Sequence, residues 1–251
     1  MQIQTLFCHN SLRNLIHIFY DESTNEAICV DPFDADQAYD FVQKNKLQLK
    51  YIINTHEHFD HIRGNQSLKE KTGAQIYSVN GVRNIDKKIL DQQELILGNI
   101  KIQFFHTPGH TLNHISFLAN DENLFCGDML FNAGVGRCSN GGDVTTMYHT
   151  FQSFFAKLPG STKIYPGHDY IENNLNFAKQ REPSNKSLDL MLGQAKSLRG
   201  KDQFIVTSMQ QERSYNPFLR LDSKEIQERC QSIDATPEET FKCLRRLRDE
   251  W

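Results

Sequence analysis

The chain has 251 residues, enough to bury a substantial core in one large domain or in a main domain with an appendage. Its net charge of −3 gives no sign of nucleic acid or of an anionic membrane as a partner, and no apolar run approaches the roughly 20 residues that span a bilayer. The N-terminal MQIQTLFCHN lacks the layout of a secretory signal, so we expect a cytoplasmic protein.

Short β-type runs dominate the chain up to about residue 170. They cover residues 3–7, 15–19, 27–30, 51–53, 76–79, 100–105, 115–118 and 163–165. Helical patterns lie between them near residues 36–45, 62–71 and 146–157. Because strands alternate with helices, the sequence predicts an α/β assembly and excludes a helix bundle.

The strand signal fades after residue 170, and the remaining chain has helical patterns. The predicted helices cover residues 171–181, 187–198, 223–231 and 237–248. Pro183 follows the first of them and Pro217 precedes the third, at places where helices are interrupted. We therefore predict a main α/β domain over residues 1–170 and a small helical domain over residues 171–251.

The turn THEHFDH, residues 55–61, holds three imidazoles and a carboxylate directly after the apolar run 51–53. His56 and His58 are two apart, so on an extended or tightly turning backbone their rings can share one cation. Asp60 and His61 would project to a different side and could serve a second cation. The spacing differs from that of a zincin helix, whose histidines are four apart. The turn thus predicts a metal site, against the alternative of a polar loop with incidental histidines.

Three further candidate ligands follow other predicted strands. His110 lies in TPGHT after the run 100–105, Asp128 lies in GDMLF after residues 123–126, and His168 lies in PGHDY after the run 163–165. Each of them alone is weak evidence, because a lone histidine is more often structural. Together they indicate a site at one edge of a sheet, where α/β proteins commonly carry their functional loops.

The segments THEHFDH, TPGHT, CGDMLF and PGHDY resemble those of the metallo-β-lactamase superfamily in its dinuclear hydrolase branch. REPSN, residues 181–185, and NPFLR, residues 216–220, resemble the C-terminal helical domain of the glyoxalase II (hydroxyacylglutathione hydrolase) family. The resemblance implies a metallo-β-lactamase-like αββα sandwich for residues 1–170, which bind metal and carry catalysis. It also implies a helical domain, residues 171–251, that contributes to substrate binding.

The resemblance implies two divalent metal ions, with Zn²⁺ as the first choice and Fe or Mn as alternatives. The ligands of the first ion would be His56, His58 and His110, those of the second Asp60, His61 and His168, and Asp128 would bridge the two ions. Two cations sharing one water lower the pKa of that water toward neutrality. The resulting metal-bridging hydroxide, oriented by Asp60, would attack a thioester carbonyl.

The implied reaction cleaves S-D-lactoylglutathione, a 2-hydroxyacylglutathione, to glutathione and D-lactate in methylglyoxal detoxification. The substrate-binding candidates are Arg137, Tyr170, Arg220 and Lys224. The loop GVGRCSNGGD, residues 134–143, departs from the family pattern, because Ser139 stands where an aromatic contact is expected. The peptide end of glutathione is therefore expected to be held differently in this chain, which we also expect to be a monomer.

Three alternatives remain open from the sequence. A thioesterase with another thiol partner would use the same metal chemistry. A mono-iron persulfide dioxygenase, from a related branch of the superfamily, also shows a segment similar to residues 164–170, but that branch is shorter and lacks REPSN and NPFLR. A binding module without activity is disfavoured, because all seven predicted ligands are present.

Overall fold

The computed structural model describes residues 1–230 and 234–251, which form two compact units. The first unit comprises Met1–Thr107, Asn113–Gly127 and Tyr165–Asp169. The second comprises Pro108–Leu112, Asp128–Ile164 and Tyr170–Trp251. The predicted helical domain thus corresponds to the last segment of the second unit, which also takes in two earlier segments. Among the described residues, no helix is both long and apolar enough to cross a membrane.

The first unit contains a six-stranded sheet in the order β1 to β6. Its strands are β1 (Gln2–Phe7), β2 (Leu15–Tyr20), β3 (Glu26–Val30), β4 (Gln48–Ile53), β5 (Gln75–Ser78) and β6 (Lys87–Lys88). The pairs β1–β2 and β2–β3 are antiparallel, whereas β3 to β6 are parallel. Because β3 and β4 run in the same direction, the residues that follow them meet at one edge of the sheet.

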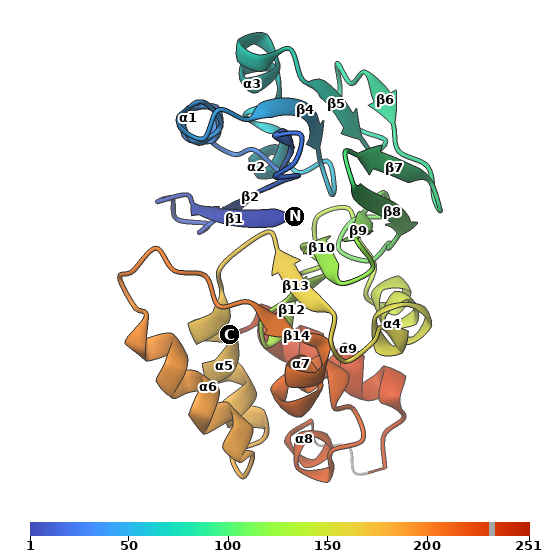
Figure 1. The fold of residues 1–251 in the computed structure, drawn as a ribbon. Helices are drawn as coiled ribbons and strands as arrows, with labels where there is room; N and C mark the ends of the chain where they lie inside the picture. The colour runs from blue at the N-terminus through green and yellow to red at the C-terminus, as the bar shows by residue number, and fades with distance from the viewer. Residues whose placement is uncertain (231–233) are drawn as a thin grey trace. The chain divides into compact units, whose positions relative to one another are not determined.

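Helices cover one face of this sheet. α1 (Ala35–Lys44) begins at Asp34, whose side chain accepts hydrogen bonds from two backbone amides of the first turn. Its buried residues Ala38 and Val42 pack in one apolar cluster with Leu68 of α3 (Asn65–Thr72) and with strand residues such as Ile52. Figure 1 shows α1 and α3 beside β4. The predicted helix 62–71 agrees with α3 apart from its first three residues, and a separate short helix, α2 (Phe59–Ile62), precedes it.

A second sheet contributes β7 (Glu94–Leu97), β8 (Ile100–His106), β9 (Ile115–Ala119), β10 (Asn123–Gly127) and the end of β13 (Lys163–Pro166) to the first unit. Aromatic side chains fill the space between the two sheets. The rings of Phe19 and Phe125 stack with centroids 4.9 Å apart, and those of Phe117 and Phe125 stack at 4.8 Å. The α/β class predicted from the sequence is confirmed by this two-sheet core with its covering helices.

The second unit is mainly helical. Its elements are β11 (Leu130–Phe131), β12 (Gly134–Val135), α4 (Val144–Ser153), η1 (Phe155–Lys157), α5 (Ile171–Arg181), α6 (Lys186–Ser197), β14 (Thr207–Ser208), α7 (Met209–Tyr215), η2 (Pro217–Leu219), α8 (Lys224–Arg229) and α9 (Pro237–Asp249). The predicted helices 171–181, 187–198 and 237–248 agree with α5, α6 and α9 within one residue at each end. The last residue of the predicted helix 223–231 lies outside the described residues. α7 was not predicted from the sequence.

A buried carboxylate holds the β11–β12 hairpin in place. Glu212 of α7 is fully buried and accepts hydrogen bonds from the amide of Ala133 at 2.8 Å and from the hydroxyls of Thr207 and Tyr215 at 2.7 and 2.8 Å. Burial raises the pKa of Glu212. Ala133 has a positive φ of 57°, an unusual conformation for a residue with a side chain. α7 therefore stabilises the hairpin that directly follows Asp128.

Candidate metal centre

The turn after β4 is held against the residues that follow β3. The amide of Asp31 donates to the carbonyl of Ile53 at 3.0 Å, and the amide of Gly64 donates to the carbonyl of Pro32 at 2.7 Å. A Cβ atom at Gly64 would lie 2.3 Å from that carbonyl oxygen, so the close approach requires glycine. The side chain of Asn54 donates to the carbonyl of His61 at 3.0 Å and fixes the far end of the turn.

Asp31 orients one of the predicted ligands. Its carboxylate is buried and accepts hydrogen bonds from the amide of Thr55 at 2.8 Å, from the hydroxyl of Thr55 at 2.7 Å and from Nδ1 of His61 at 2.9 Å. A neutral imidazole carries one proton, and here Nδ1 carries it. Nε2 of His61 is therefore left as an unprotonated nitrogen for a metal ion, with a carboxylate behind the ring as in many metal sites.

His168 is prepared in the same way by a backbone carbonyl. It follows β13, and its Nδ1 donates to the carbonyl of Leu12 at 2.7 Å. The preceding Gly167 donates its amide to the carbonyl of Gly127 at 2.9 Å, which ties the end of β13 to the end of β10. Nε2 of the buried His168 thus presents a lone pair.

Three predicted ligands converge within the first unit. Nε2 of His61 and Nε2 of His168 lie 3.2 Å apart, and Oδ2 of Asp60 lies 3.5 and 3.4 Å from them. Two nitrogen lone pairs and a carboxylate oxygen repel one another at these separations unless positive charge lies between them. Ligand atoms at 2.0–2.1 Å around a tetrahedral zinc ion are about 3.3 Å apart. The geometry of Asp60, His61 and His168 therefore fits a divalent metal ion.

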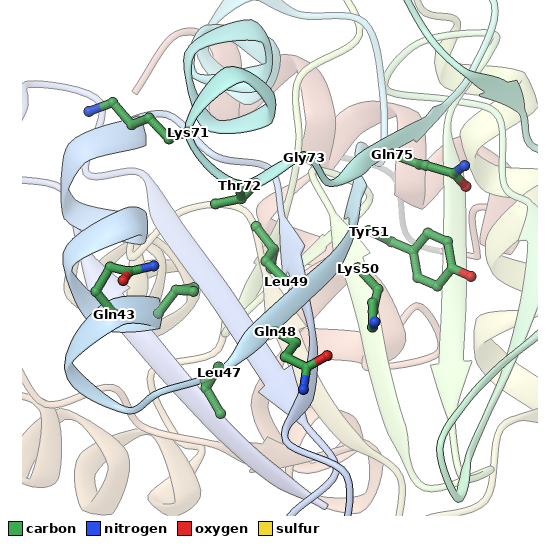
Figure 2. A pocket seen from close by; sticks show the side chains of 11 residues that line it. Gln43, Leu47, Gln48, Leu49, Lys50, Tyr51, Lys71, Thr72, Gly73 and Gln75 are labelled. Carbon is green, nitrogen blue, oxygen red and sulfur yellow. The ribbon is translucent and has the colours of Figure 1, made fainter.

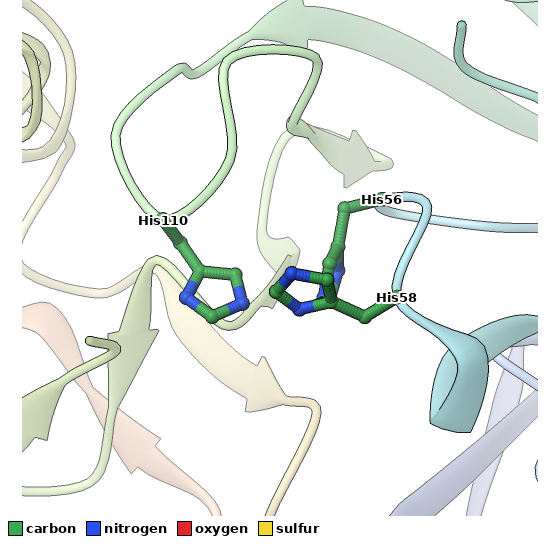
Figure 3. Close-up of side chains that lie close together, drawn as sticks. All are labelled: His56, His58 and His110. Atoms are coloured by element: carbon green, nitrogen blue, oxygen red, sulfur yellow. The ribbon is translucent and has the colours of Figure 1, made fainter. Parts of the chain in front are cut away.

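His56 and His58 form a second pair of imidazoles in the same turn. Nε2 of His56 lies 3.1 Å from Nδ1 of His58 (Figure 3). The hydroxyl of Thr55 donates its proton to Asp31, so it accepts one from Nδ1 of His56 at 3.0 Å, and Nε2 of His56 is again left unprotonated. His56 is buried and His58 is partly buried. The pair offers two nitrogen ligands at the spacing of a metal site.

The remaining two predicted ligands lie in the second unit. Nδ1 of His110 donates to the carbonyl of Arg137 at 2.6 Å, and its Nε2 lies 3.5 Å from Oδ2 of Asp128. A Cβ atom at Gly136 would lie 2.0 Å from the carbonyl oxygen of Asp128 and 2.9 Å from Nδ1 of His110, so the loop can contact both ligands only with glycine there. His110 and Asp128 thus face each other, as expected of ligands to one ion.

An arginine cluster in the second unit was not predicted from the sequence. Arg245 of α9 is buried and donates to the carbonyls of Val135 and Gly136 at 2.8 and 3.0 Å. Burial, together with the neighbouring Arg245 and Arg137, lowers the pKa of Arg248, whose charge also interacts with Tyr170. Arg137 and Tyr170, both predicted, therefore share a region of concentrated positive charge with α9. A helical spacing of Phe241, Arg245 and Arg248 on the buried face was the available signal.

A pocket of about 440 Å³ lies beside this cluster. It is lined by Cys138, Ser139, Gly142, Asp143, Val144, Lys242, Arg245, Arg246, Asp249 and Glu250. Its wall includes Cys138 and Ser139, where the sequence departs from the family pattern. Its lining combines the small side chains of Cys138 and Ser139 with three cations and three carboxylates, so the pocket is polar and of mixed charge.

Arg220 and Lys224 lie in other surroundings. The guanidinium of Arg220 makes two hydrogen bonds of 2.7 Å to the buried carboxylate of Glu182 and one of 3.2 Å to the carbonyl of Arg213. Lys224 is exposed and pairs with Asp234 at 2.9 Å. These contacts give both cations protein partners, and the role in substrate binding predicted for them stays a prediction.

A larger pocket, of about 580 Å³, lies in the first unit at the start of β4. Figure 2 shows its wall, which includes Gln48 to Tyr51 of β4 and Lys71 of α3. Lys71 pairs with Asp36, and Lys50 pairs with Glu26 at 3.4 Å. The described residues that line this pocket include no imidazole, thiol or carboxylate, so it offers no metal site.

Comparison with known proteins agrees with these features. Residues 18–85 match the model of the metallo-beta-lactamase superfamily, and residues 169–251 match that of the hydroxyacylglutathione hydrolase C-terminus. The hydroxyacylglutathione hydrolase of Nitrosococcus oceani is 36% identical over 264 residues and is covered over 100% of both chains. The cytoplasmic hydroxyacylglutathione hydrolase of Arabidopsis thaliana is 34% identical, with 95% of each chain covered.

The crystal structure of ETHE1 from Myxococcus xanthus superposes with a TM-score of 0.73 at 27% sequence identity, over 98% of this chain and 91% of that one. These matches confirm the predicted metallo-β-lactamase fold with a helical C-terminal region. The chain therefore belongs to the hydroxyacylglutathione hydrolase family of the metallo-β-lactamase superfamily, whose members are thioester hydrolases.

Proposed function

We propose that this protein is a dinuclear metal-dependent hydrolase that cleaves S-D-lactoylglutathione to glutathione and D-lactate, and so serves methylglyoxal detoxification. The observation that carries the metal part is the convergence of Nε2 of His61, Nε2 of His168 and Oδ2 of Asp60 at 3.2–3.5 Å. The substrate part is supported by relatives named hydroxyacylglutathione hydrolase that match over the whole chain.

In this proposal His56, His58 and His110 would hold one ion, Asp60, His61 and His168 would hold the other, and Asp128 would be a ligand of both. The donor set contains only imidazole nitrogens and carboxylate oxygens, which suits Zn²⁺ and also admits Fe or Mn. When bound, two such ions supply a hydroxide at neutral pH and stabilise both the oxyanion and the leaving thiolate. Asp60 would have a second role, because its carboxylate could also accept a hydrogen bond from the attacking hydroxide and orient it.

We assign the anionic glutathione part of the substrate to the cluster of Arg137, Arg245, Arg248 and Tyr170. Three guanidinium groups in one region favour carboxylates, which arginine binds in bidentate fashion. Asp249 contacts Arg245 at 3.0 Å, so this guanidinium already has a carboxylate partner, and we expect Arg137 and Arg248 to make the main contacts to the substrate. Arg220 then has a structural role through Glu182, and the altered loop at Cys138 and Ser139 shapes the adjoining pocket.

The test is hydrolysis of S-D-lactoylglutathione by zinc-loaded protein, with the metal content measured on the same sample. We expect turnover with about two equivalents of metal. Asp128→Ala should abolish activity and reduce the metal content together. Absence of turnover with two metals bound would leave the metal site intact and remove the substrate assignment. One iron per chain with oxygen consumption would instead support the persulfide dioxygenase considered from the sequence.

A further inference from the structure

We propose that the turn formed by residues 10–14 positions the ligands of the metal ion bound by Asp60, His61 and His168, and that Asn14 is its central positioning residue. The inference rests on the metal centre of the proposed function but not on its substrate. The turn lies in the first unit, about forty residues before the ligand motif in the sequence.

Asn14 contacts the carboxylate of Asp60 directly. Its side chain is 2% exposed, and its Nδ2 donates to Oδ2 of Asp60 at 2.9 Å and to the carbonyl of Asp60 at 3.3 Å. Oδ2 is the same oxygen that faces the unprotonated nitrogens of His61 and His168. A carboxylate oxygen has two lone pairs, so one can accept from Asn14 while the other stays available for a cation between the three ligands.

The orientation of the Asn14 amide is determined by its own neighbours. Oδ1 of Asn14 accepts from Nδ2 of Asn10 at 2.7 Å, and Oδ1 of Asn10 accepts from the backbone amide of Asn14 at 3.1 Å. A backbone amide can only donate, so Asn10 cannot be flipped, and Asn14 must then present its NH₂ group to Asp60. The two asparagines form a chain of hydrogen bonds with one direction, which ends on the ligand.

The carboxylate needs such support because of its surroundings. Asp60 belongs to the four-residue helix α2, and its side chain is 19% exposed. A partly exposed side chain at the start of so short a helix can rotate out toward water. The Asn14 amide provides a fixed donor that stabilises the rotamer in which Oδ2 faces the two imidazoles.

The same turn also contacts His168. The carbonyl of Leu12 accepts the proton of Nδ1 of His168, as described above. The turn is fastened beyond this ligand as well, because the guanidinium of Arg13 donates to the carbonyl of Asp169 at 2.7 Å and pairs with its carboxylate. Arg13 has a positive φ of 55°, a strained conformation that these contacts maintain. One turn therefore orients two of the three ligands.

The test compares Asn14→Ala with Asn113→Ala as a matched control. Asn113 also donates from its Nδ2 to a carboxylate, at 3.0 Å, but this carboxylate is Glu57, which lies within the ligand motif and is not a predicted ligand. The readout is zinc titration against a chelator. We expect Asn14→Ala to weaken one of the two zinc equivalents by about 10- to 100-fold, the usual effect of removing a contact behind a ligand. Asn113→Ala should retain both equivalents at the affinity of the wild type.

Asn10→Ala is the second variant, because it retains Asn14 and only removes the contact that orients its amide. It should weaken the same zinc equivalent to a smaller extent, and it decides the question if Asn14→Ala fails to fold. Unchanged zinc affinity in the folded variants would overturn the inference and leave Asn14 as a residue of the fold alone. Because zinc binding is measured without substrate, failure to hydrolyse S-D-lactoylglutathione would refute the proposed function and not this role of Asn14.

Discussion

The substitution Asp31→Asn tests whether the tautomer of a ligand is set from behind. Oδ1 of Asp31 accepts from the amide of Thr55, which can only donate, so the carbonyl oxygen of an asparagine must occupy that position. Its NH₂ group then replaces Oδ2 and faces Nδ1 of His61, 2.9 Å away in the wild type. Nδ1 must become an acceptor, and the proton moves to Nε2. That proton would point at Nε2 of His168, where the metal ion is expected.

The magnitude follows from the loss of one nitrogen ligand. Altering a group behind a metal ligand typically weakens metal affinity by about 10- to 100-fold, or about 1.4–2.7 kcal/mol. We expect the upper end here, because the 3.2 Å separation of the two Nε2 atoms then becomes an ordinary hydrogen bond that competes with the metal. The fold should tolerate the change. Asp31 has a positive φ of 50°, and asparagine adopts this conformation readily.

The assay is zinc titration of Asp31→Asn against a chelator, with urea unfolding of the metal-free protein as the measure of fold stability. Asp31→Ala is the comparison, since alanine leaves the buried donors of Thr55 and His61 without an acceptor and is disfavoured at positive φ. It should lower the free energy of unfolding by about 3 kcal/mol or more, whereas Asp31→Asn should lower it by about 1 kcal/mol. Full zinc affinity in a folded Asp31→Asn protein would refute the tautomer argument.

Further substitutions test the substrate site and the pH dependence of stability. Arg137→Ala and Arg248→Ala should each raise KM for S-D-lactoylglutathione about tenfold with little change in kcat, since each variant loses a charged contact to the substrate. Arg229→Ala, at an exposed position, is the control and should leave KM unchanged. An unchanged KM in either of the first two variants would remove that arginine from the glutathione site. Arg220→Ala should lower the free energy of unfolding by about 2–3 kcal/mol, because the buried Glu182 loses its cation and retains only its hydrogen bonds from Asn185 and Ser223. A raised KM would instead support the predicted anion binding. Burial lowers the pKa of His17 to about 4. Below about pH 6.5 the unfolded state therefore binds more protons at this residue than the folded state does. Between pH 7 and pH 5 this difference should lower the free energy of unfolding by about 2 kcal/mol. In urea unfolding of the metal-free proteins, His17→Gln should lack this part of the loss of stability at acid pH. An identical pH dependence of the free energy of unfolding in His17→Gln and the wild type would contradict the role assigned to His17.

The main features of the fold could be predicted because the sequence signals are local. The strands β2, β3 and β9 are short apolar runs, and α1, α5 and α9 have apolar residues at helical spacing. α7 was missed because its seven residues, MQQERSY, carry little apolar periodicity. Its stability comes instead from the capping box at Ser208 and from the buried contacts of Glu212, and the latter involve residues far apart in the sequence.

The candidate site was predicted unevenly for a similar reason. Asp60 and His61 lie in one seven-residue motif and His168 stands directly after a strand, so their positions made them candidates, and the family resemblance grouped the three around one ion. Arg245 and Arg248 were missed, since arginines on an amphipathic helix are ordinary unless their burial is known. Arg220 was selected by resemblance, and only the structure reveals its two hydrogen bonds to Glu182.

The orientation of the histidines shows why a ligand motif alone does not make a metal site. Nδ1 of His56 faces the hydroxyl of Thr55, that of His61 faces Asp31, that of His110 faces the carbonyl of Arg137, and that of His168 faces the carbonyl of Leu12. These four acceptors come from different parts of the chain, and two of them are backbone carbonyls that any residue could supply. Each ring is thereby held as the tautomer with an unprotonated Nε2, so little reorganisation is left for metal binding. Changes at these acceptors should therefore weaken metal binding even where every ligand is retained.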